Sequence, residues 1–119
     1  MQVFLFFTST VFAASLAIAN VVNVYLSAKD TKTVETAIMR ACQDKDWTPV
    51  KKPDNIITAT LHVIQHMIVV DINYSKTGYS ITYKDSVNMQ YNASKNKIHA
   101  KYSAWVANFS KSIKGNIVY

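Results

Sequence analysis

The sequence predicts an α+β domain in which two helices cover one face of a three-stranded antiparallel meander, in the order αβββα. Apolar residues recur with helical spacing after residue 31, alternate with polar residues between residues 56 and 84, and return to helical spacing after residue 97. A sheet with one apolar face buries that face against helices, so a two-layer sandwich accommodates all three segments. The chain has 119 residues, enough for one such domain.

The N-terminal segment is apolar, and residues 1–28 contain no charged side chain. It includes Ala17-Ile18-Ala19, a small-x-small pattern typical of a signal-peptidase site, and we favour cleavage before Asn20. Two alternatives stay open: a retained membrane anchor, because about 20 apolar residues cross a bilayer, or a buried helix of a cytosolic protein. The predicted organisation is a signal peptide or anchor over residues 1–19, a linker over 20–30 and a single domain over 31–119.

The first expected helix begins after Asp30 or Thr31, either of which can cap its N-terminus. Its apolar residues fall on one face: Val34, Ala37, Ile38 and Ala41. We expect the helix to end at residues 44–46 and Trp47 to fold back over one end of the core. Residues 48–55, which include Pro49 and Pro53, are expected as a connection.

Period-two alternation predicts strands over residues 56–63, 68–74 and 79–84. Residues 75–78 are expected to form a hairpin loop in which Gly78 is free to adopt positive φ. A second helix is expected to begin near Lys97 and to end at Gly115. Its apolar stripe contains Ile98, Tyr102, Trp105, Val106, Phe109 and Ile113.

The sheet face opposite the helices is expected to be polar and open to a partner. Its predicted partner-binding residues are Thr58, Thr60, His62, Asn73, Ser80 and Thr82. A short sheet also has two strand edges that can accept a strand of another protein. The sequence therefore predicts a non-enzymatic module that binds an envelope component through this face or an edge.

Positive charge is concentrated near the C-terminus, because residues 86–119 contain five lysines and no acidic residue. The predicted anion-binding residues are Lys97, Lys101, Lys111 and Lys114. The alternative function is therefore binding of lipid headgroups or cell-wall fragments, although solvated lysines also keep a small protein soluble. Basic residues that are all lysine in this region, together with an export signal, argue against nucleic acid as the partner.

Four segments carry a resemblance, of which the second and fourth are the most specific: Ile57–Leu61, Tyr79-Ser80-Ile81-Thr82-Tyr83-Lys84-Asp85-Ser86, Asn88–Tyr91, and the run from Ile98-His99 to Trp105-Val106. With them, residues 34–113 resemble a group of small proteobacterial envelope lipoproteins of unassigned function. The resemblance implies a periplasmic or membrane-attached location and carries no catalytic assignment. It also implies a secretion signal that ends in a lipid-modified cysteine, from which this chain departs, because its single Cys42 lies in the first expected helix.

No residue set in the sequence predicts catalysis, a metal or a cofactor. His62 and His66 would stand about 13 Å apart on a strand, too far to share one ion. His99, near the start of the second helix, is expected to hydrogen-bond to the preceding loop, and Cys42 is expected to be partly buried and unreactive. Asp71 and Asp85 are expected to be solvated, so we predict that the protein is not an enzyme.

Overall fold

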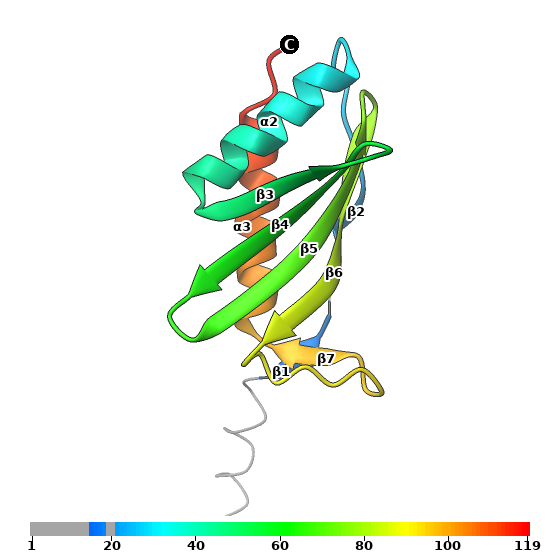
Figure 1. Ribbon diagram of the computed structural model, residues 1–119. Coiled ribbons are helices and arrows are strands. Elements are labelled where there is room, and N and C mark those ends of the chain that lie inside the picture. Colours follow the sequence, from blue (N-terminus) through cyan, green and yellow to red (C-terminus); the bar gives the residue numbers. More distant parts are fainter. Residues whose placement is uncertain (1–14, 19–20) are drawn as a thin grey trace, which may run out of the picture.

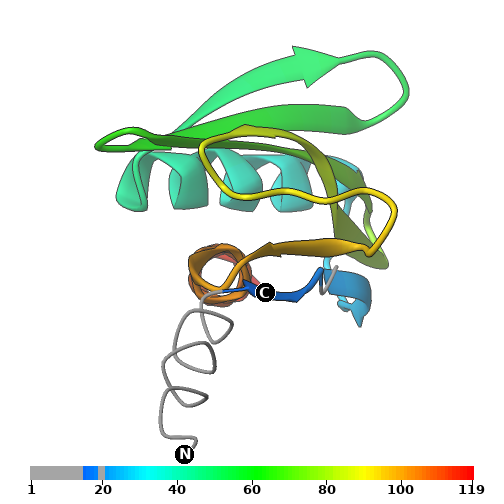
Figure 2. The same cartoon turned by 90° about the horizontal axis from the view of Figure 1, so that it is seen from below.

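The computed structural model describes residues 15–18 and 21–119. Within them, five antiparallel strands form one sheet in the order β2 (Val21–Tyr25), β6 (Gly78–Val87), β5 (His66–Ser75), β4 (Ile56–Val63) and β3 (Trp47–Lys52). The helices α2 (Thr31–Asp44) and α3 (Lys101–Gly115) lie on one side of this sheet (Figures 1 and 2). The α+β class is confirmed. The three-stranded meander is wrong in strand number, because β2 and β3 flank the expected strands β4, β5 and β6.

The helix α2 begins as the sequence predicts. The Asp30 carboxylate accepts hydrogen bonds from the Thr33 backbone N–H at 2.8 Å and from the Thr33 hydroxyl at 2.6 Å. These bonds satisfy an N-terminal amide that has no partner inside the helix. The apolar face of α2 is fully buried: Val34, Ala37, Ile38, Ala41 and Cys42.

Residues 47–52 form the edge strand β3 instead of the expected connection. β3 pairs with β4 from Trp47 opposite Leu61 to Lys52 opposite Ile56. Pro49 suggested a loop, but an edge strand tolerates proline because one side of its backbone has no strand to bond. Trp47 is buried and stacks on Phe109, with ring centroids 4.6 Å apart, so the expectation that it covers the core is confirmed.

The segment 20–30, expected as a linker, contains the other edge strand, β2. Adjacent Val21 and Val22 obscure the period-two pattern in the sequence, and β2 pairs with β6 through a register shift. Gly78 allows this pairing, because a Cβ there would collide with the carbonyl oxygen of Val24. Gly78 does not adopt positive φ, so the role predicted for it in the turn is wrong.

Residues 97–99 form the strand β7 (Lys97–His99) instead of the first turn of a helix, and α3 begins at Lys101. β7 pairs with β1 (Ser15–Ala17), with Ser15 opposite His99 and Ala17 opposite Lys97. The end of the expected signal or anchor segment therefore lies in the fold, whereas its residues 1–14 and 19 lie outside the described residues. In the described part of the chain, neither helix has the length and apolar character needed to cross a bilayer.

The helix α3 packs on the same side of the sheet as α2. Its expected stripe is buried at Tyr102, Val106, Phe109 and Ile113, whereas Trp105 is only half-buried. The hydroxyls of Tyr79 in β6 and Ser110 in α3 lie 2.6 Å apart in the core. This polar pair fixes α3 against the sheet, since a buried hydroxyl without a partner is costly.

Candidate functional site

The sheet face directed away from both helices is built from the polar residues of the three central strands (Figure 2). The register brings them into rows across the strands. Thr58, Asp71 and Thr82 form one row, Asn73 and Ser80 form the next, and Thr60 lies opposite Val69. We call this surface the open face, defined by residues 58, 60, 62, 69, 71, 73, 80, 82 and 84. It contains the six residues predicted to bind a partner.

Asp71 is the centre of the polar contacts on the open face. Its carboxylate accepts a hydrogen bond from the Thr58 hydroxyl at 2.6 Å and an ion pair from the Lys84 ammonium at 3.3 Å. Asp71 and Asp85 belong to different rows, so they form no acid/base pair. Because these contacts lie within the sheet, they fix the side chains of the open face and reduce the entropy lost when a partner binds.

The edge strand β3 extends the open face, because Thr48 and Val50 are the cross-strand neighbours of Thr60 and Thr58. Val50 is an exposed apolar residue. At the end of the open face next to the β5–β6 hairpin, Asn73 and Ser80 line a shallow hollow of about 340 Å³. Tyr25, which is 83% exposed, also lines this hollow. The open face therefore combines polar rows with exposed apolar groups, a composition typical of protein interfaces.

The edge of β3 is poorly suited to accept a strand. Pro49 lacks a backbone N–H, and the two lysines Lys51 and Lys52 are exposed on the same strand. Proline and lysine on an edge strand are features that block strand addition. Of the two interaction modes predicted, the face is therefore better supported than the β3 edge.

The four predicted anion-binding lysines are exposed but do not form one site. Lys97 lies in β7, and Lys101 lies at the start of α3. Lys111 is ten residues further along α3, about 15 Å along the helix axis, and Lys114 lies beyond it. A single small anion therefore cannot contact all four lysines.

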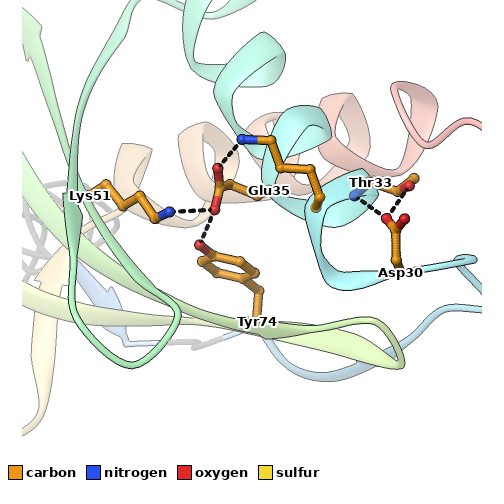
Figure 3. Close-up of polar contacts among 6 residues, drawn as sticks. Asp30, Thr33, Glu35, Lys51 and Tyr74 are labelled. Atoms are coloured by element: carbon orange, nitrogen blue, oxygen red, sulfur yellow. Dashed lines mark hydrogen bonds and ion pairs between the residues drawn. The ribbon is translucent and has the colours of Figure 1, made fainter.

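A polar cluster that the sequence does not reveal lies between α2 and the sheet (Figure 3). The Glu35 carboxylate accepts a hydrogen bond from the Tyr74 hydroxyl at 2.8 Å and ion pairs from Lys51 at 2.9 Å and Lys32 at 2.8 Å. Lys32 lies three residues before Glu35 on α2, but Lys51 and Tyr74 are distant in the sequence, and no local spacing links them to Glu35. The contacts tie α2 to both β3 and β5.

The protonation states of this cluster oppose catalysis. The hydrogen bonds from Lys32, Lys51 and Tyr74 lower the pKa of Glu35 to about 2. Burial and the adjacent carboxylate raise the pKa of Tyr74 to about 12. At neutral pH, Glu35 is therefore ionised and Tyr74 protonated, so neither is poised to exchange a proton, and we interpret the cluster as structural.

The structure brings together His66 and His99, which are distant in the sequence. The rings of His66 and His99 lie 5.4 Å apart, and Trp105 lies 6.1 Å from His66. His99 lies in β7, and its ring accepts a hydrogen bond from the Lys101 backbone N–H at 3.1 Å, at the start of α3 and not from the preceding loop as expected. His62 is exposed on the open face. In residues 15–18 and 21–119, no three His, Cys, Asp or Glu side chains are grouped as metal ligands.

Cys42 is buried in α2, and burial raises the pKa of its thiol to about 12. A thiol that remains protonated and inaccessible is a poor nucleophile. The prediction that Cys42 is partly buried and unreactive therefore agrees with its environment.

Comparisons with known proteins add no assignment to this geometry: no family model, no curated protein and no solved structure matches the chain.

Proposed function

We propose that the protein is a non-enzymatic module of the cell envelope, periplasmic or attached to the membrane, which binds another envelope protein through its open face. The location rests on the apolar N-terminal segment and on the resemblance to small envelope lipoproteins. The binding role rests on the open face itself.

The observation that carries the proposal is the position of both helices on one side of the sheet (Figure 2). Within the described residues, the rows around Asp71 therefore stay uncovered, and each central strand contributes to them. These residues are fixed by the sheet, and Tyr25 and Val50 add exposed apolar area at its margins. A rigid surface of this kind suits a protein partner, because few of its groups must be ordered on binding.

The test is crosslinking of the tagged full chain in the cells that produce it, followed by mass spectrometry. Asn73→Arg places a long cationic side chain on the open face, and we expect it to lower the yield of the crosslinked partner about tenfold, equivalent to about 1.4 kcal/mol. Asn108→Arg is the matched control, since Asn108 is also exposed but lies on α3. Equal yields from the two variants would show that the open face is not the interface.

The alternative function, headgroup binding by the Lys-rich helix, has a separate test. The triple variant Lys101→Gln, Lys111→Gln and Lys114→Gln removes three charges from α3 and leaves the open face unchanged. We expect this variant to keep the crosslinked protein partner. Its binding to vesicles that contain phosphatidylglycerol should fall if α3 holds headgroups, whereas unchanged vesicle binding would show that these lysines are only solvated.

A further inference from the structure

One end of the molecule gathers the β4–β5 turn, the end of β6, the β1–β7 pair and the start of α3 (Figure 1). His66 donates a hydrogen bond from Nδ1 to the Asn88 carbonyl at 2.7 Å, and Asn88 Nδ2 donates to the Gln65 carbonyl at 2.9 Å. The backbone N–H of His99 donates to the Met89 carbonyl at 2.7 Å. We call this surface the histidine end, defined by residues 63–67, 87–91 and 95–101.

Ile64, at the tip of the β4–β5 turn, has an unfavourable backbone conformation and an exposed apolar side chain. Its backbone φ is 57°, in the left-handed region that a β-branched residue rarely adopts, and its side chain is 96% exposed. Both features cost stability in water, and no described contact compensates for them. Val87 and Tyr91, which are 49% and 43% exposed, add further apolar area at the same end.

The charged side chains of the histidine end are all lysines. It contains the exposed residues Lys95, Lys97 and Lys101, and its three ranges include no acidic residue. Asp85 lies just outside, in β6, where its carboxylate accepts a hydrogen bond from the Ser86 backbone N–H at 2.8 Å. Exposed apolar side chains beside several lysines are typical of surfaces that contact anionic lipids.

The N-terminal segment joins the fold at this same end, because Ser15 pairs with His99. The fourteen residues that precede Ser15 contain no charged side chain. Cleavage before Asn20 would also remove β1 from its pairing with β7. An uncleaved N-terminal segment would therefore leave the fold at the histidine end, and its apolar residues would draw that end towards a lipid surface.

We propose that the histidine end lies against an anionic lipid bilayer, with Ile64 in the interfacial region and Lys95, Lys97 and Lys101 among the headgroups. The partner is the lipid surface itself. The proposal does not depend on what the open face binds.

The test uses the full chain reconstituted into vesicles of phosphatidylcholine, with or without phosphatidylglycerol. Val87→Cys carries an environment-sensitive fluorophore at the histidine end, and Lys76→Cys carries it on the opposite hairpin, while buried Cys42 is shielded from labelling. We expect the fluorophore at residue 87 to shift its emission to the blue and to be quenched by spin-labelled lipid in the anionic vesicles. The fluorophore at residue 76 should show neither change.

Two further variants in the Val87→Cys background assign the contact to side chains. Ile64→Gly keeps the turn and removes the apolar tip, and the pair Lys97→Gln and Lys101→Gln removes charge; each should reduce the blue shift and the quenching. An aqueous environment at residue 87 in every vesicle would overturn the proposal. A blue shift that requires an added protein, and not lipid alone, would also overturn it and would indicate a protein partner.

Discussion

Glu35 is the residue on which the attachment of α2 to the sheet is centred. Its side chain is only 12% exposed, and it joins one helix to two strands through Tyr74 and Lys51. Both lysines of the cluster are largely exposed, so solvent screens their charges and limits what each pair contributes. The bond from Tyr74 is better protected, because the tyrosine itself is buried.

The pH dependence of stability follows from the pKa of Glu35, which is lower in the folded chain, at about 2, than its ordinary value of 4.5. A depressed pKa stabilises the fold above about pH 4.5, and this contribution is lost as the pH falls towards 2. Glu35→Gln should therefore lower the free energy of unfolding by about 1–2 kcal/mol at pH 7 and by much less near pH 2. Urea unfolding of the full chain at both pH values measures the difference. A deficit of the same size at both would contradict the role given to the carboxylate.

At the scale of elements, the two edge strands depend on different features of the chain. β3 is fixed by its neighbour β4 and by Trp47, which stacks on Phe109 in the core. β2 depends on the close approach of its backbone to Gly78, and it continues into the bond from the Leu26 N–H to the Thr77 carbonyl at 2.9 Å. A single methyl group is therefore expected to disturb β2 and leave β3 intact.

Gly78→Ala tests this dependence. We expect it to cost about 1–3 kcal/mol, because either β2 or β6 must shift to admit the added carbon. Gly115→Ala is a matched control, since a Cβ at Gly115, the last residue of α3, would meet no atom within 4 Å. The control should be neutral or slightly stabilising, because alanine favours the helix. If the two variants were equally stable in thermal unfolding, the close approach of β2 would not be significant.

At the scale of the whole molecule, the sequence predicts the parts of the fold that repeat with a clear period. β4 and most of β5 and β6 alternate between buried and more exposed residues, and the same alternation predicts the open face, because successive residues of a strand point to opposite sides. The edge strands are harder to predict, since β3 contains proline and β2 has consecutive valines. A three-residue strand such as β7 is too short to show a period.

The contacts between distant segments are beyond such reasoning for a physical reason. Glu35 meets Lys51 and Tyr74, and His66 meets His99, only after the chain has folded. The spacing of residues along the chain does not predict these pairs. The unusual β4–β5 turn, by contrast, can be recognised in the sequence. The residues at this turn, which include Ile64, contain no glycine, proline or asparagine.

Photo-crosslinking in intact cells shows whether the open face binds a partner in the envelope. A photoreactive amino acid at Thr60 samples the open face, and the same residue at Ala107 samples the exposed side of α3. We expect a discrete covalent adduct with one envelope protein from position 60 and none from position 107. An adduct from position 107 alone, or no adduct from position 60 in cells that produce both variants equally, would contradict this expectation.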